Sequence, residues 1–182
     1  MEKAFIFHGT GSSSNNHWFP WMKEKLEEKG LKVYTPDFPT PENQNLENWM
    51  DVLEEYPNID EETVLIGHST GAVFILSVLE KVENLKAAYL ISGFTGKLGI
   101  EFDELNETFA EKEFDFENIK NSAEELHVFH SASDPYVPLE KAEELARNLE
   151  ASLHLKADAG HFNTDSGYTE FPELLREIEN KI

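Results

Sequence analysis

Short apolar runs alternate with amphipathic helical stretches from one end of the chain to the other, and this alternation most constrains the fold. The expected strands are 4–7, 31–34, 63–67, 87–92, 126–130 and 152–156. The expected helices are 17–30, a stretch around 46–53, 72–82, 138–149 and 171–182. Parallel strands need crossover connections, which are usually helices. The pattern therefore predicts an α/β fold in which a six-stranded parallel sheet carries helices on both faces.

Composition narrows the class of protein. A length of 182 residues favours one domain, 1–182, and 40% hydrophobic residues suffice for a packed core. The net charge of −21 argues against binding nucleic acid or an anionic membrane surface. The chain has no cysteine, which excludes disulfides, thiolate metal sites and a cysteine nucleophile. No apolar run approaches the length of a membrane span or signal-peptide core, so we expect a cytoplasmic protein.

One connection is longer than the others and strongly acidic. Residues 94–125 carry ten acidic and three basic side chains, a net charge of 3 − 10 = −7. The segment lies between the fourth and fifth expected strands. We expect a solvated excursion with one or two short helices, too short to close over a site as a lid.

A possible nucleophile follows the third expected strand. Gly67-His68-Ser69-Thr70-Gly71 fits the G-x-S-x-G pattern and lies between an apolar strand and a helix. In that setting the motif forms a sharp turn that projects the serine hydroxyl from the carboxyl edge of the sheet. A plain strand-to-helix turn with packing glycines is the alternative.

A serine nucleophile needs a base and an acid that orients the base. His161 lies in a loop after the sixth expected strand, and Asp134 follows the fifth, so all three groups reach the same sheet edge. A surface loop histidine and a turn-forming aspartate are the alternative interpretations. His127 and His130 lie at positions i and i+3 of one strand and point to opposite faces, so we expect no shared metal.

The loop after the first strand has two interpretations. The backbone N–H groups of Thr70 and Thr10 are expected to bind an oxyanion, with Gly11 as the second choice after Thr10. The same loop, Gly9 to Ser14, with Asp37 downstream, approaches a dinucleotide-binding fingerprint. It lacks the third glycine, and the next helix is expected to begin too late to bind a pyrophosphate.

Taken together, these motifs resemble the α/β-hydrolase superfamily, and within it the small lidless serine hydrolases of the retinoblastoma-binding protein 9 / YdeN-like family. The resemblance extends over nearly the whole chain. It is carried by 17–21 (HWFPW), Pro36-Asp37 followed by Trp49, the serine motif, 90–92 (LIS), 134–138 (DPYVP) and 160–162 (GHF).

The resemblance implies a three-layer fold with strand order 2-1-3-4-5-6, and it places nucleophile, acid and base on Ser69, Asp134 and His161. A substrate pocket is expected from His17, Trp18, Phe94, Tyr136 and Phe162. Binding of the retinoblastoma protein is associated with a Leu-x-Cys-x-Glu motif. Because the chain has no cysteine, that partner is not expected.

The expected function is hydrolysis of a small-molecule carboxylic ester, or of an amide, through an acyl-enzyme, without cofactor or metal. A non-catalytic protein-interaction module that keeps the hydrolase fold is the alternative. The sequence does not indicate the physiological substrate or the oligomeric state.

Overall fold

The computed structural model describes residues 2–182 and contains the expected six-stranded sheet, whose strands run parallel in the order β2-β1-β3-β4-β5-β6. The predicted fold class and strand order are confirmed. The central strand β3 pairs Val64 with Ala87 of β4, while Phe5 of β1 lies opposite Leu65. The strands are β1 (Lys3–Phe7), β2 (Lys32–Tyr34), β3 (Thr63–His68), β4 (Ala87–Ile91), β5 (Leu126–Ser131) and β6 (Ser152–Lys156).

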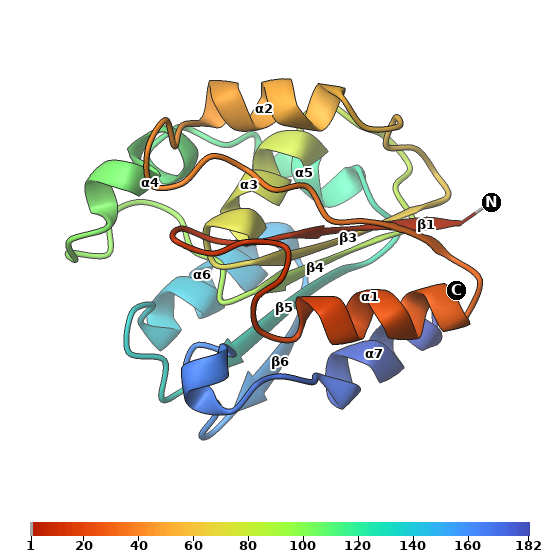
Figure 1. Ribbon diagram of the computed structural model, residues 1–182. Coiled ribbons are helices and arrows are strands. Elements are labelled where there is room, and N and C mark those ends of the chain that lie inside the picture. Colours follow the sequence, from red (N-terminus) through yellow and green to blue (C-terminus); the bar gives the residue numbers. More distant parts are fainter. Residues whose placement is uncertain (1) are drawn as a thin grey trace.

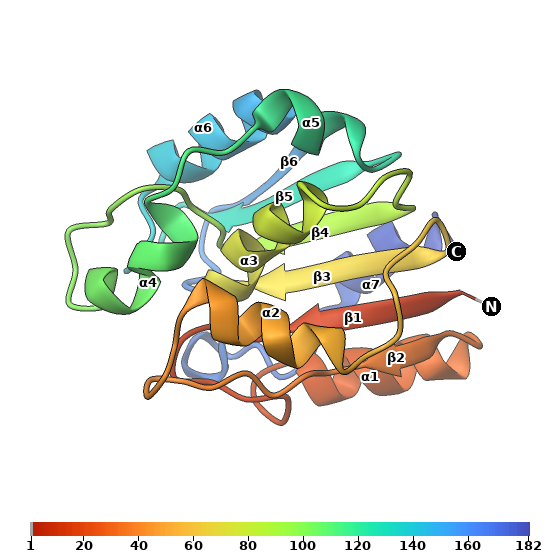
Figure 2. The same cartoon turned by 90° about the horizontal axis from the view of Figure 1, so that it is seen from above.

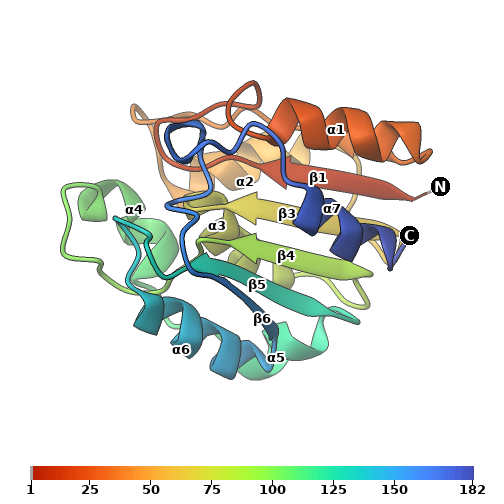
Figure 3. The same cartoon turned by 90° about the horizontal axis from the view of Figure 1, so that it is seen from below.

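Helices cover both faces of the sheet and make three layers (Figure 1). One face carries α2, α3 and α5 (Figure 2), and the opposite face carries α1 and α7 (Figure 3). The helices are α1 (Phe19–Glu28), α2 (Leu46–Glu54), α3 (Thr70–Leu79), α4 (Asp103–Ala110), α5 (Phe116–Asn121), α6 (Leu139–Leu149) and α7 (Pro172–Glu179), with a short 3-10 helix, η1 (Thr164–Ser166), before α7.

Alternating side chains of the strands divide into two hydrophobic cores. Phe5, Phe7 and Leu65 pack beneath α2 and α3, whereas Ala4 and Ile66 pack beneath α1 and α7. Every residue of β3 and of α3 is buried, because the sheet is covered on both sides there. This central strand and helix provide the rigid support for the turn at residue 69.

The structure corrects the expected bounds of the first helix and the expected character of residues 94–125. The helix expected over 17–30 begins at Phe19, because His17 has a positive φ of 54°, and it ends at Glu28, before Gly30. The excursion 94–125 does contain two short helices, but it is not a solvated segment. Phe109 and Ile119 are fully buried against the core. The apolar residues of the segment pack against the core beside α3, while its acidic residues do not prevent this burial.

The carboxyl ends of the strands meet at one edge of the sheet, where the long loops gather. The turn after β3, the loop after β5 and the loop after β6 all begin there. Within residues 2–182, no helix is long and apolar enough to cross a membrane.

Candidate active site

The turn between β3 and α3 holds Ser69 in a strained conformation. Its backbone has φ 56° and ψ −122°, a region that non-glycine residues rarely adopt. A Cβ at Gly67 would lie 2.5 Å from the Gly71 carbonyl oxygen, and one at Gly71 would lie 2.4 Å from the Phe7 carbonyl oxygen. Only glycine fits at these two positions, because a side chain would collide with the neighbouring backbone. Small residues at both positions are typical of a nucleophile elbow.

The loop after β1 lies directly against this serine. A Cβ at Gly9 would lie 2.8 Å from the Ser69 Cβ and 3.3 Å from its Oγ. Beyond this contact, Ser69 and His161 line a single cavity of about 320 Å³. The sequence-predicted nucleophile and base are thus brought to one cavity from loops 92 residues apart.

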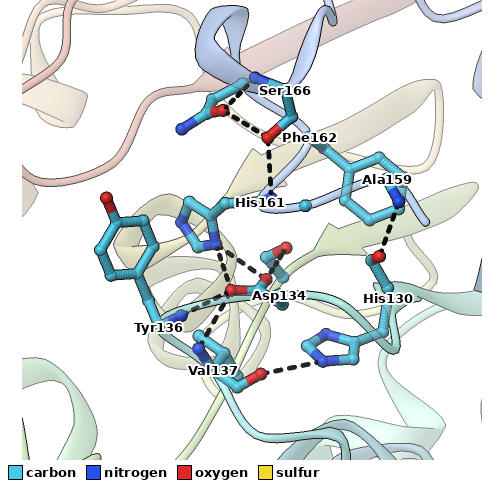
Figure 4. Close-up of polar contacts among 12 residues, drawn as sticks. His130, Asp134, Tyr136, Val137, Ala159, His161, Phe162 and Ser166 are labelled. Carbon is cyan, nitrogen blue, oxygen red and sulfur yellow. Dashed lines mark hydrogen bonds and ion pairs between the residues drawn. The ribbon is translucent and has the colours of Figure 1, made fainter. Parts of the chain in front are cut away.

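The loops after β5 and β6 join the predicted acid to the predicted base (Figure 4). The Nδ1 atom of His161 lies 2.8 Å from Oδ2 and 3.0 Å from Oδ1 of Asp134. Since a carboxylate accepts, the His161 ring donates from Nδ1, which leaves Nε2 of the neutral ring free to accept a proton. The Tyr136 ring lies edge-on to the His161 ring, with centroids 5.0 Å apart.

Hydrogen bonds, the one from His161 above all, keep Asp134 ionised although its side chain is fully buried. Burial by itself disfavours the charged carboxylate, but hydrogen bonds outweigh it and lower the pKa of Asp134. The donors are the His161 ring and the N–H groups of Tyr136 and Val137, at 3.0 and 3.1 Å. A stable negative charge beside Nδ1 fixes the tautomer of the imidazole.

The Ser69 hydroxyl does not yet engage the base. Among residues 2–182, no side chain is hydrogen-bonded to its Oγ or to Nε2 of His161. In enzymes without substrate, contacts of this kind are often long and tighten when the substrate binds.

Two polar residues that the sequence analysis missed support the acid and the base. Ser92, at φ 50° just after β4, donates its hydroxyl to Oδ2 of Asp134 at 2.8 Å. His68 donates from Nε2 to the backbone carbonyl of His161 at 2.7 Å. The sequence pattern could not identify these contacts. A serine just after a strand and a histidine at the end of a buried strand are ordinarily interpreted as structural residues.

Both residues expected to supply the oxyanion donors line the cavity. Thr70 begins α3, so its N–H has no intrahelical acceptor. Over the described range, neither the Thr70 nor the Thr10 backbone N–H donates to a protein atom. Gly11, the second choice, donates its N–H to the Thr40 hydroxyl at 2.7 Å and is not available.

A buried polar network fixes both threonines. The two Thr hydroxyls lie 2.8 Å apart, and the Thr70 hydroxyl donates to Oδ1 of Asn106 at 2.7 Å. Gln44 donates to the Thr10 hydroxyl at 2.7 Å and to the Leu105 carbonyl at 2.9 Å. Because Asn106 lies on α4, this network ties the acidic excursion to the loop and the elbow around Ser69.

The expected pocket residues divide into two groups. His17, Phe94 and Tyr136 line the cavity. Trp18 and Phe162 do not: both are fully buried in the core beneath α1 and α7, and the Trp18 indole donates to the Phe162 carbonyl at 2.9 Å. This hydrogen bond connects the residue before α1 to the loop that carries His161. The cavity walls instead include Leu98, Ile100 and Phe102, supplied by the excursion.

The loop at residues 9–14, which approaches a dinucleotide-binding fingerprint in sequence, is hydrogen-bonded to Asp37 in the structure. Asp37 accepts hydrogen bonds from the Ser14 backbone N–H at 2.7 Å and from its hydroxyl at 3.0 Å. Its carboxylate therefore closes the loop after β1. The next helix along the chain begins only at Phe19, eight residues beyond Gly11, so the glycines do not lead directly into a helix N-terminus as they do in a dinucleotide-binding loop.

The fold is that of an α/β hydrolase. A family model described as serine hydrolase matches residues 4–180. The chain therefore belongs to the serine hydrolase family, as its resemblance to the retinoblastoma-binding protein 9 / YdeN-like hydrolases implied.

Relatives are similar over almost their entire length. The YdeN protein of Bacillus subtilis (strain 168) is 34% identical over 175 residues, which cover 94% of this chain and 91% of YdeN. The serine hydrolase RBBP9 of Rattus norvegicus is 30% identical over 183 residues, covering 99% and 95%. The crystal structure of the B. subtilis ydeN gene product superposes with a TM-score of 0.92 at 32% identity, over 100% of this chain and 98% of that one.

Proposed function

We propose that this serine hydrolase cleaves carboxylic esters, and amides as a second substrate class, through an acyl-enzyme on Ser69. The proposal rests above all on one observation. Asp134 accepts a hydrogen bond from Nδ1 of His161, and His161 lines the same cavity as Ser69. A base oriented by a buried carboxylate beside a strained serine is the arrangement that nucleophilic acyl transfer needs.

In the proposed reaction the Ser69 Oγ attacks the carbonyl carbon of the ester while His161 Nε2 takes the hydroxyl proton. The carbonyl electron pair moves to oxygen, where the Thr70 and Thr10 N–H groups stabilise the negative charge. The carbon–oxygen bond to the leaving group breaks, and the departing alcohol receives the proton from His161. Water, deprotonated by the same imidazole, then releases the acid and restores Ser69.

Asp134 has a positioning role in this scheme. It keeps the His161 proton on Nδ1 in the resting state, so that Nε2 faces the reaction, and it stabilises the imidazolium that forms. The buried network of Thr10, Thr70 and Asn106 holds the oxyanion donors before substrate arrives. Donors that need no rearrangement stabilise developing charge most effectively.

A fluorophosphonate probe and p-nitrophenyl acetate test the proposal together. The wild-type chain should be labelled and should hydrolyse the ester. Ser69→Ala should lose labelling and lose on the order of 10⁴–10⁶ in kcat, because the covalent route disappears. Ser13→Ala, a serine of the loop after β1, is the matched control and should retain both. An unlabelled, inactive wild-type chain would favour the non-catalytic interaction module.

A further inference from the structure

A second cluster of functional side chains lies away from the cavity, between the sheet and α7. One candidate ligand atom from each of His127, His154 and Glu177 lies within 4.8 Å of the other two. His127 is near the start of β5, whereas Asp134 follows the end of that strand. This three-residue group, the α7-side cluster, takes no part in the proposed hydrolysis.

Strand register brings the two histidines together. Phe129 of β5 lies opposite His154 of β6, so His127, two residues earlier, projects from the same face. His127 Nδ1 and His154 Nε2 lie 3.0 Å apart. Two nitrogens bound to one tetrahedral zinc at about 2.0–2.1 Å would lie about 3.4 Å apart. The observed 3.0 Å is a hydrogen bond between the two rings, so an ion bound by both would replace this bond and move the nitrogens about 0.4 Å farther apart.

Aromatic neighbours hold both rings in place. His127 stacks on Tyr89 with centroids 4.7 Å apart and planes at 10°. His154 stacks on Phe129 with centroids 4.2 Å apart and planes at 6°. The Tyr89 hydroxyl donates to the Glu177 backbone carbonyl at 3.1 Å, which fixes the height of α7 above the rings. These contacts restrain both rings in the absence of an ion.

The tautomer of His127 directs a lone pair into the cluster. Its Nε2 lies 3.0 Å from the Glu125 carboxylate, which also pairs with Lys181. A carboxylate only accepts, so Nε2 carries the proton and Nδ1 of the neutral ring is unprotonated. A histidine that donates to a carboxylate from one nitrogen while the other binds an ion is a recurrent arrangement around protein metal sites.

The third residue brings negative charge without a partner. Within residues 2–182, the Glu177 carboxylate makes no hydrogen bond or ion pair with protein. His154 and Glu177 are both partly exposed, so the cluster opens to solvent. We propose that His127, His154 and Glu177 bind a zinc-type divalent cation with water completing the coordination, and that this ion ties α7 to β5 and the edge strand β6.

Zinc titration of the tag-free chain tests this site. Isothermal titration calorimetry with ZnCl₂ should show one site, and zinc should raise the melting temperature. His154→Phe keeps a ring on Phe129 but removes the nitrogen, and Glu177→Gln removes the charge. Each should weaken zinc binding at least tenfold and abolish the zinc-dependent rise in melting temperature.

Two matched variants separate this site from other sources of binding. Glu173→Gln, on the same helix but paired with Lys156, should bind zinc as the wild type does. His17→Gln removes a histidine of the active-site cavity and so tests whether zinc binds there instead. It should also bind zinc as the wild type does. The proposal is overturned if the wild type binds no zinc, if His154→Phe and Glu177→Gln bind it unchanged, or if binding is lost only in His17→Gln.

Discussion

His68 donates its Nε2 proton to the backbone carbonyl of His161, across 93 residues of sequence and a distance of 2.7 Å. The residue that precedes the serine therefore holds the loop that carries the base. The two rings are also in contact, with centroids 4.8 Å apart. The Nδ1 atom of His68 is buried and has no hydrogen-bond partner among residues 2–182, so the site contains a neutral histidine in a structural position.

This relationship predicts a pH-dependent stability. Burial, followed by the nearby charge of His161, lowers the pKa of His68 well below its ordinary value of 6.5. Below about pH 6.5 the His68 side chain of the unfolded chain binds a proton, whereas the buried His68 side chain of the folded chain stays neutral. The stabilisation is therefore complete above pH 6.5 and is lost as the pH falls toward the folded pKa, by at most about 1.4 kcal/mol per pH unit.

Denaturant unfolding at pH 7.5, 6.5, 5.5 and 5.0 measures this effect. His68→Gln should be less stable at pH 7.5 but should lose less stability on acidification than the wild type. His8, His17, His130 and His154 also have lowered pKa values through burial, so a residual slope should remain. Parallel pH profiles for the variant and the wild type would contradict the assignment to His68.

Ser92 should act as a positioning residue. Its hydroxyl donates to Oδ2 of Asp134, the carboxylate oxygen nearest His161. Ser92→Ala should lower kcat by about tenfold with little change in KM, because one donor to a buried carboxylate is lost while the others remain. The acid limb of the kcat–pH profile should also shift, which a purely structural effect would not produce. Ser92→Thr, which keeps the hydroxyl, should retain more activity than the alanine variant.

Gly9 should be essential because of crowding at the serine. A methyl group there would lie 2.8 Å from the Ser69 Cβ and 3.0 Å from the His68 carbonyl oxygen. Gly9→Ala should displace the loop or the serine and lower kcat by at least about a hundredfold. Circular dichroism and the melting temperature report whether the fold survives. A Gly9→Ala variant with wild-type kcat would show that this close approach is unimportant.

The fold was predictable because its signals are local and repeated. Apolar runs such as 63–67 and the glycines around Ser69 constrain the strands and the elbow wherever the rest of the chain goes. The supporting contacts were not predictable, because they depend on register and loop packing. Trp18 illustrates the difference: it was expected in the substrate pocket, whereas the structure buries it in the core that α1 and α7 cover.

The same limit applies to the α7-side cluster. In the sequence analysis His127 was compared only with His130, which lies on the same strand. His127 instead pairs with His154, and only the parallel register of β5 and β6 reveals this partner. Single-strand spacing carries no information about a neighbour 27 residues away.

The cavity predicts a preference for short acyl chains. Its volume of about 320 Å³ is at the small end of ligand pockets, and Phe102 forms part of the apolar wall. A series of p-nitrophenyl esters should give the highest kcat/KM between acetate and butyrate. Phe102→Ala should move the optimum to longer chains by widening the cavity. An optimum at twelve or more carbons in the wild type would contradict the prediction.

The last prediction concerns which aspartate orients the base. Asp134 accepts from His161 Nδ1, whereas Asp158 accepts from the Ser133 hydroxyl at 3.2 Å and Asp165 lies at the cavity wall. Asp134→Asn replaces a pure acceptor with a side chain that also donates, so the His161 proton is no longer held on Nδ1. We expect kcat for p-nitrophenyl acetate to fall by about 10⁴.

Asp158→Asn and Asp165→Asn are the matched controls for this substitution. Each removes one negative charge near the same loop without touching the hydrogen bond to Nδ1, so each should change kcat by less than about tenfold. Loss of a negative charge alone would lower kcat similarly in all three variants. Loss of the His161 tautomer lowers kcat only in Asp134→Asn. The assignment fails if Asp134→Asn stays near the wild-type rate while either control loses most of its activity.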